Sequence, residues 1–177
     1  MVLRENPALP GEPLVITVVL NTNRREDTLA CLASLATSRY PNHRAIVLDN
    51  ASTDGSVPAI RAAHPDVRIV CLPANLGYAG NNNVGIAEAC AEGADWVFVL
   101  NEDAVLHEGC LAELVRAGSS DSRIGVVGPL VYHYDEPERI QSAGGVLGPQ
   151  WESRHLAQNE VDRGQFTEPR DVDWVSG

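Results

Sequence analysis

The chain has 177 residues, a length that favours a single domain with a buried core. Hydrophobic residues make up 44% of it and charged residues 21%, which is the balance of a globular protein rather than of a disordered chain. The formal net charge is -11, with 24 acidic and 13 basic residues, and this surface argues against nucleic-acid binding. No apolar run approaches the roughly 20 residues of a membrane-spanning helix. The N-terminus is polar and rich in proline, unlike a signal peptide, so a cytoplasmic location is expected, with the inner face of the membrane left open.

Predicted strands and helices alternate through the first part of the chain, after an extended leader expected at residues 1–13. The strand predictions rest on continuous runs rich in β-branched residues, as in strands buried on both faces, at residues 14–20, 44–48, 67–72 and 96–100. The helix predictions rest on apolar residues at helical spacing, at residues 27–38, with Asp27 as the cap, and at 56–63, 82–92 and 108–117. This alternation predicts an α/β fold, with a mostly parallel sheet covered by helices on both faces.

After residue 117 the alternation stops. Short strands, broken by glycine and proline, are predicted at residues 124–127, 130–134 and 144–147. Residues 151–170 are polar and weakly patterned, which predicts a loop, and residues 172–177 alternate like a strand. The four cysteines lack CxxC spacing and the five histidines lack metal-ligand spacing. Buried free thiols are therefore expected, rather than a disulfide or a zinc site.

Polar segments follow all four predicted parallel strands. In open α/β sheets, ligands bind at the carboxyl ends of the strands, so these segments form the candidate site. They are residues 21–25, 49–55, 75–83 and 101–104.

Each segment allows a ligand-binding and a purely structural interpretation. Asp49 could accept a hydrogen bond from the imide N–H of a pyrimidine base, whereas Ser52 and Asp54 beside it are equally typical of a capped turn. The glycines and asparagines of residues 75–85 could let backbone N–H groups approach a diphosphate, or form a plain loop. Residues 101–103 offer oxygen ligands for Mg²⁺ or Mn²⁺, or a simple polar turn.

Taken together and in this order, the segments resemble the glycosyltransferases of family 2, in particular their rhamnosyltransferase-like branch. The resemblance covers residues 14–177 and rests on VVLNTNR, IVLDNASTDGS, NLGYAGNNNVGI, WVFVLNEDAVLHEG, GVVGPLVYHYD and DVDWVSG. It implies one nucleotide-sugar-binding domain with the GT-A fold, a Rossmann-like α/β arrangement. It also implies an enzyme that uses Mg²⁺ or Mn²⁺ to transfer sugar from a nucleotide-sugar donor to a glycan or lipid-linked acceptor. The acceptor could be associated with the membrane.

The resemblance further implies nine residues of the nucleotide-sugar site. They are Asn21, Thr22, Asn23 and Asp49 for the base, Gly80 and Asn82 beside the diphosphate, and Asn101, Glu102 and Asp103 for the ribose and the metal. Asp103 matches the aspartate that contacts the divalent ion.

Three positions depart from the family pattern. Thr22 stands where many relatives have an aromatic residue on the base, and Asn82 where many have an arginine near the phosphates. Asn101 replaces the first aspartate of the D-x-D element. Relatives also continue past the DVDWVSG segment to a later aspartate that acts as general base. The chain is therefore expected to be truncated, with its general base beyond Gly177, and to bind the donor without transferring sugar.

The identity of the donor and two other functions remain open from sequence alone. The DNASTDGS, LNEDAVLHEG and DVDWVSG segments are most similar to the rhamnosyltransferase-like branch, so dTDP-rhamnose is the first expectation. A sugar nucleotidyltransferase would have a glycine-rich, arginine-containing loop after the first strand, and residues 21–25 contain no glycine. A non-catalytic nucleotide-binding module is the other alternative.

Overall fold

The structure, a computed structural model, describes residues 11–176, which belong to two compact units divided after Ala112. Residues 1–10 of the predicted leader lie outside the described residues. Of the rest, the Glu12 carbonyl accepts a hydrogen bond from Asn42 Nδ2 at 2.8 Å, and the Pro13 carbonyl accepts one from the Tyr40 hydroxyl at 2.6 Å.

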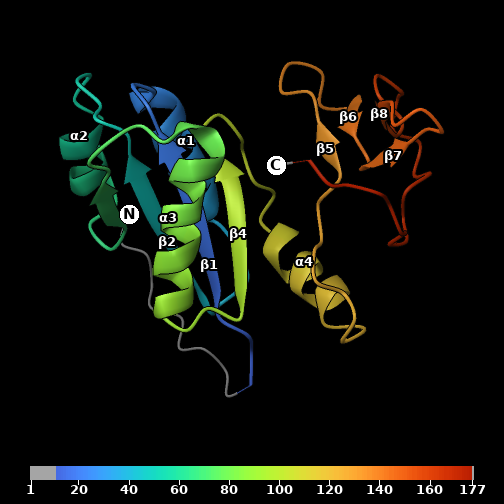
Figure 1. The fold of residues 1–177 in the computed structure, drawn as a ribbon, viewed down its shortest axis with the longest axis horizontal. Coiled ribbons are helices and arrows are strands. Elements are labelled where there is room, and N and C mark those ends of the chain that lie inside the picture. Colours follow the sequence, from blue (N-terminus) through green and yellow to red (C-terminus); the bar gives the residue numbers. More distant parts are fainter. Residues whose placement is uncertain (1–10, 177) are drawn as a thin grey trace. The chain divides into compact units, whose positions relative to one another are not determined.

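The first unit is built on a parallel sheet of four strands in the order β3-β2-β1-β4 (Figure 1). The strands are β1 (Val15–Asn21), β2 (His43–Asp49), β3 (Arg68–Cys71) and β4 (Trp96–Asn101), each within one residue of its prediction. Every residue of the inner strand β1 is buried, as the continuous apolar run predicts. The parallel α/β sheet predicted from sequence is therefore confirmed.

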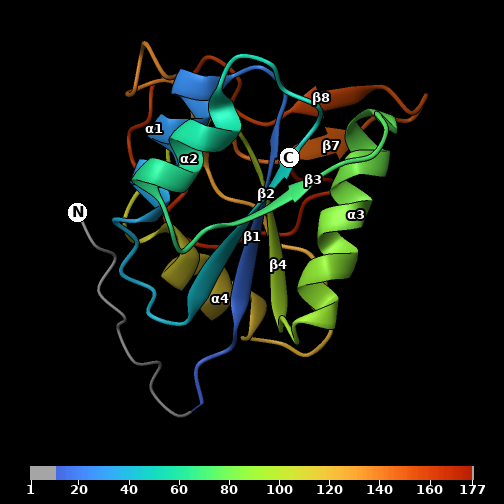
Figure 2. The ribbon, with the colours of Figure 1, turned by 90° about the vertical axis from the view of Figure 1, so that its left-hand side faces the viewer.

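Helices cover both faces of this sheet (Figure 2). On one face lie α1 (Arg25–Leu35) and α2 (Ser56–Ala63), and on the other lies α3 (Gly77–Ala91). Beneath α3, the side chains of β1 and β2 form a core with Leu72 and Ala89. Gly85 lets α3 approach closely, since a Cβ atom there would lie 2.4 Å from Val18 Cγ1.

Three helix starts differ from the prediction, and the helix predicted from residue 108 begins at Cys110. The first helix begins at Arg25, so Asp27 lies inside the first turn and is not its cap. Helix α3 begins at Gly77, five residues before the predicted start, because side-chain amides hold its first turn. Asn81 Oδ1 accepts from Leu76 N and Asn75 Oδ1 accepts from Gly77 N, both at 2.9 Å. These bonds outweigh the low helix propensity of glycine and asparagine.

The second unit contains two short antiparallel pairs, and α4 (Cys110–Gly118) leads the chain into it. The strands are β5 (Val131–Tyr132) with β6 (Ile140–Ser142), and β7 (Gly145–Leu147) with β8 (Ser153–His155). The predicted strand at 124–127 is wrong, since this segment has no pairing and Val126 is 73% exposed. The predicted loop at 151–170 is wrong where it contains β8.

Residues 172–176, which alternate like a strand in the sequence, form a single bridge, between Trp174 and Gly145, rather than a strand. They pack on glycines instead. A Cβ atom on Gly145 would lie 1.8 Å from the Trp174 ring, and one on Gly144 would lie 2.8 Å from Val172 Cγ1.

All four cysteines are free, as expected, but their predicted burial holds only in part. Cys31 is buried and Cys110 is half-buried, whereas Cys71 and Cys90 are exposed. Cys71 ends the edge strand β3, and Cys90 lies on the outer side of α3, so neither is covered by another element. No helix among the described residues is both long and apolar enough to cross a bilayer.

Candidate functional site

The carboxyl ends of β2, β1 and β4 lie in one row, and they bring the predicted site residues together. Asn21 at the end of β1 is paired with Asp49, and its neighbour Leu20 is paired with Asn101. Because side chains alternate along a strand, Asn21 and Asp49 project toward the face of α1, and Asn101 toward the face of α3. The hydrogen bonds of these residues, to Thr28 of α1 and to Tyr78 of α3, agree with this assignment.

Asn21 is fully buried, and its side-chain amide is used within the chain. Its Nδ2 donates to Asp49 Oδ1 at 2.8 Å and to Ser52 Oγ at 3.0 Å. Its Oδ1 accepts from the Thr28 hydroxyl at 2.9 Å. Asn21 therefore joins β1 to α1 and holds the carboxylate of Asp49 in place.

Asp49 lies just under the surface, with 4% of its area exposed. Besides the bond from Asn21, its Oδ2 accepts from Ser52 N at 3.2 Å. Each oxygen thus has one partner, and a carboxylate offers about four acceptor positions. Asp49 keeps the capacity to accept a further hydrogen bond from a ligand.

The loops after β1 and β2 are held against each other in uncommon backbone conformations. Asn23 has φ 54° and Ala51 has φ 55°, the left-handed region that residues other than glycine seldom adopt. Asn23 N donates to Ser52 Oγ at 3.0 Å, and Thr53 N donates to Asn23 Oδ1 at 2.8 Å. Such conformations cluster at ligand sites, where the surrounding structure maintains them. The exposed Thr22 and Asn23 are therefore held in place at the carboxyl edge of the sheet.

Asp54 accepts hydrogen bonds from the first backbone N–H of two helices, whose N-cap residues are Arg24 and Gly55. Its Oδ2 accepts from Arg25 N at 2.9 Å, and its Oδ1 accepts from Ser56 N at 3.0 Å and from the Ser56 hydroxyl. These hydrogen bonds, foremost that of the Ser56 hydroxyl, lower the pKa of Asp54. These bonds agree with a structural role for Asp54, and Ser52 likewise accepts from Asn21 Nδ2 and Asn23 N within the loops.

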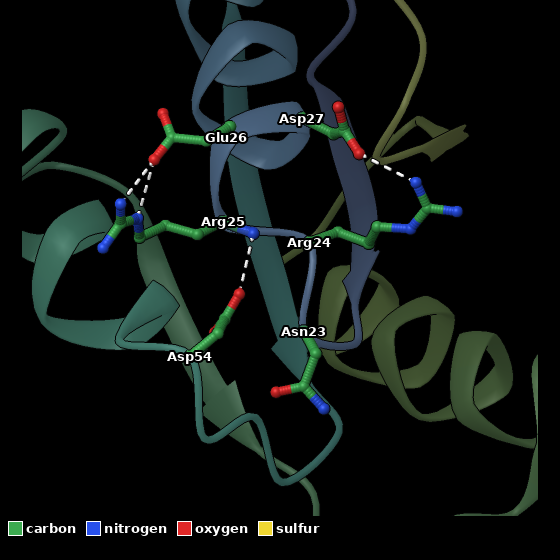
Figure 3. Close-up of a pocket in the computed structure, with 6 residues that line it drawn as sticks. All are labelled: Asn23, Arg24, Arg25, Glu26, Asp27 and Asp54. Carbon is green, nitrogen blue, oxygen red and sulfur yellow. Dashed lines mark hydrogen bonds and ion pairs between the residues drawn. The ribbon is translucent and has the colours of Figure 1, made fainter.

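A pocket of about 380 Å³ lies on the α1 side of this edge (Figure 3). Arg24 and Arg25 point to opposite sides of it, where Arg24 pairs with Asp27 at 3.0 Å and Arg25 pairs with Glu26 at 2.6 Å. Asn23 is the one predicted site residue in its lining, which consists of Asn23, Arg24, Arg25, Glu26, Asp27 and Asp54. Its basic side chains are already paired, so the candidate site is the edge of the sheet beside this pocket.

Two adjacent carboxylates, Glu102 and Asp103, follow β4. Burial raises the pKa of Glu102, and the negative charge of Asp103 raises it further. The charges of both carboxylates also add to the effect of burial on Tyr78, whose pKa is raised, and on Cys31, whose pKa rises to about 12. The end of β4 is therefore a region of negative potential, as expected where a cation binds.

The donor atoms at this end fit a divalent ion that is shared with a ligand. Within residues 11–176 no group of three or more His, Cys, Asp or Glu side chains is arranged to hold a metal alone. Mg²⁺, however, commonly binds through one or two carboxylates plus the phosphates of a substrate. Glu102, half-buried, and Asp103, exposed, can supply these oxygens.

The glycine-asparagine segment forms the first turns of α3, not a loop. Asn82, with 5% of its area exposed, donates from Nδ2 to the Tyr78 carbonyl at 3.1 Å, and its buried Oδ1 has no partner among the described residues. At Gly80, a Cβ atom would lie 2.6 Å from Leu76 Cβ. Exposed Tyr78 was not predicted as a site residue, although an aromatic residue inside a glycine-asparagine segment is a signal for one.

Known sequences resemble this chain over most of its length. A profile of glycosyl transferase family 2 matches residues 15–172. The N-acetylglucosaminyl-diphospho-decaprenol L-rhamnosyltransferase of Mycobacterium tuberculosis is 31% identical, over 92% of this chain and 58% of that protein. The galactofuranosyltransferase GlfT1 of the same organism is 30% identical, over 71% of this chain and 42% of that protein. The chain spans about half the length of the curated relatives it matches.

Solved structures share the fold. A mannosyltransferase from Pyrobaculum calidifontis, in complex with GDP-Man and Mn²⁺, superposes with a TM-score of 0.59 and 26% identity, over 69% of this chain and 36% of that one. The glucosyl-3-phosphoglycerate synthase of Mycobacterium tuberculosis, in complex with UDP, has a TM-score of 0.56 and 19% identity, over 68% of this chain and 45% of that one. The resemblance seen in the sequence is thus confirmed, and neither a nucleotidyltransferase nor a non-catalytic module is favoured. The chain belongs to glycosyl transferase family 2, and its sheet and helices have the GT-A fold.

Proposed function

We propose that this chain binds a nucleoside-diphosphate sugar and a divalent metal ion at the carboxyl edge of its parallel sheet. It would do so as part of a glycosyltransferase that transfers the sugar to a hydroxyl group of a glycan or lipid-linked acceptor. The observation that carries the proposal is the arrangement of Asp49 and the Glu102–Asp103 pair at the ends of the two strands that flank β1.

The two ends of the edge have different chemistry. Asp49 is held by Asn21 and Ser52 with acceptor capacity to spare, which suits the imide N–H of uracil or thymine. Adenine and cytosine offer no such donor on their ring nitrogens, so a preference for uracil and thymine nucleotides over these two follows. Thr22 and Asn23 would border the base. The buried Asn21 and Asn82 would support the site from beneath it.

Glu102 and Asp103 would hold Mg²⁺ or Mn²⁺, with Asp103 as the direct ligand. When bound, the ion would neutralise the negative charge that develops on the departing diphosphate. The negative potential at the end of β4 supports this assignment. The first turns of α3, which include Gly80, would lie beside the diphosphate near the N-terminus of that helix.

For the donor sugar we propose rhamnose, carried as dTDP-rhamnose. This choice is supported by the similarity to a rhamnosyltransferase over 92% of the chain. The name of that relative also includes a diphospho-decaprenol, which supports a lipid-linked acceptor and a place of action at a membrane surface.

Calorimetric titration of the whole chain tests nucleotide and metal binding together. We expect dTDP and UDP to bind more tightly than ADP in the presence of Mn²⁺, and EDTA to weaken this binding. Asp103→Ala should remove most of the effect of the metal, a loss of about tenfold or more in affinity, as for a lost charge-assisted contact. Asp49→Ala should instead reduce the discrimination against ADP and leave the effect of the metal intact.

Asp135→Ala is the matched control, because it removes an exposed carboxylate of the second unit. It should bind each nucleotide as the unchanged chain does. Equal affinity for ADP and dTDP, or no response to EDTA, would contradict the proposal.

A further inference from the structure

A series of hydrogen bonds connects the first turn of α3 with the end of β4. Asn82 Nδ2 donates to the backbone carbonyl of Tyr78 at 3.1 Å. The hydroxyl of Tyr78 in turn donates to Asn101 Oδ1 at 2.8 Å. Asn82 is buried under this turn, so Tyr78 projects from a backbone that is held from below.

These bonds determine which atoms of Asn101 are available to a ligand. The oxygen of its side-chain amide already accepts from Tyr78. Its Nδ2 makes no hydrogen bond within residues 11–176, and Asn101 is only partly buried. Because the amide group is planar, holding the oxygen also sets the direction of the two N–H groups. Asn101 thus offers donors at the end of β4, immediately before Glu102 and Asp103 in the chain.

An aspartate at position 101 would have a different effect. Its second oxygen would accept hydrogen bonds and add a negative charge to the Glu102–Asp103 pair. Asparagine keeps the bond to Tyr78 and presents N–H groups, which suit an oxygen acceptor of the ligand such as a ribose hydroxyl or a phosphate oxygen. Without the Tyr78 hydroxyl, the amide could rotate and turn its oxygen toward the ligand.

We propose that Tyr78 is a positioning residue of the nucleotide site, whose hydroxyl holds Asn101 so that its amide N–H groups donate to the ligand. This inference rests on the proposed function. It adds a residue that acts through Asn101, and it assigns to Asn101 the role of a hydrogen-bond donor rather than that of an acceptor or a metal ligand.

A double-mutant cycle on the whole chain tests the inference, with dTDP and UDP titrated in the presence of Mn²⁺. Tyr78→Phe keeps the ring and removes the hydroxyl, and we expect it to weaken binding about five- to tenfold, the size of one lost net hydrogen bond. Asn101→Asp keeps an acceptor for Tyr78 and removes the N–H groups, and we expect a loss of about tenfold. When Tyr78→Phe is added to the Asn101→Asp variant, it should have no further effect on affinity, because there is no N–H group left to orient.

Tyr132→Phe is the matched control, because it removes a tyrosine hydroxyl that donates to Asp162 at 2.5 Å in the second unit. It should leave nucleotide affinity unchanged. A purely structural role of Tyr78 would lower the unfolding temperature without this pattern of coupling. We expect instead that Tyr78→Phe unfolds at the same temperature as Tyr132→Phe and shows the coupling to Asn101.

Three outcomes would overturn the inference. One is additive losses in the double variant, which would mean that Tyr78 acts independently of Asn101. Another is unchanged or tighter binding by Asn101→Asp, which would mean that an oxygen faces the ligand. The third is that Tyr78→Phe binds nucleotide as tightly as the parent chain does. This outcome would leave the proposed function intact. Absence of nucleotide binding by the parent chain would overturn the proposed function itself, and this inference with it.

Discussion

Asn21 and Asp49 lie opposite each other in the sheet, but they have different tasks. Asn21 is completely buried, and its amide is bonded to Asp49, Ser52 and Thr28. Asp49 keeps acceptor capacity toward the edge of the sheet. The family resemblance implied that both residues bind the base. Burial indicates that Asn21 acts by holding Asp49, and the contact of Asp49 with a base stays a prediction.

Replacing Asn21 with alanine should destabilise the fold. Asn21→Ala leaves the buried Thr28 hydroxyl and an oxygen of Asp49 without a partner, and each unpaired buried group costs about 1–3 kcal/mol. The free energy of unfolding, measured in urea, should therefore fall by at least about 1–3 kcal/mol. Asn83→Ala, at an exposed position of α3, is the control, and its effect should stay within about 0.5 kcal/mol. Equal stability of the two variants would refute the supporting role of Asn21.

At the scale of elements, α3 contributes most to the form of the site. Its first turn carries Tyr78, and its middle packs closely against the sheet at Gly85. The sequence pattern places the start of this helix at Asn82, because glycines and asparagines are poor helix formers. The structure begins it at Gly77, since the side chains of Asn75 and Asn81 bond the backbone of the first turn.

Gly85→Ala should destabilise the first unit, although alanine favours a helix by up to about 1 kcal/mol over glycine. The added Cβ would lie 2.4 Å from Val18 Cγ1 and 2.9 Å from Leu48 Cδ1, so α3 or the sheet must shift. Overpacking of this kind costs about 1–3 kcal/mol, measurable as a lower urea midpoint. In Gly125→Ala, by contrast, the new methyl group meets nothing within 4 Å, and stability should be unchanged. A Gly85→Ala chain as stable as this control would show that α3 tolerates the displacement.

At the scale of the whole molecule, all nine predicted site residues belong to the first unit, between Asn21 and Asp103. Ligand binding should therefore stabilise that unit. The second unit has its own antiparallel pairs, and its C-terminal segment packs on Gly144 and Gly145.

A thermal-shift series of nucleotide sugars should identify the donor. A ligand that binds only the native state stabilises it by about 2.7 kcal/mol at 100 times its dissociation constant. With Mn²⁺ present, dTDP-rhamnose should raise the unfolding temperature more than UDP-glucose or UDP-N-acetylglucosamine at equal concentration, and EDTA should abolish most of the shift. A larger shift with the UDP-sugars would exclude rhamnose as the preferred donor. An ADP-sugar serves as the purine control, because adenine has no ring N–H for Asp49 to accept, and it should give a smaller shift.

The sequence by itself determined the strands of the parallel sheet and the edge at which the site lies. Buried parallel strands must be continuously apolar, and their carboxyl ends meet at one edge, so position along the chain was sufficient to nominate Asp49 and Asp103. The family resemblance was contained in the same segments. The tertiary structure alone decided which of these residues are buried supports and which remain open to a ligand. It also decided the bond between Tyr78 and Asn101, and the pairing of β8 with β7 inside a predicted loop. These features depend on contacts between segments far apart in the chain, which neither local propensity nor hydrophobic period encodes.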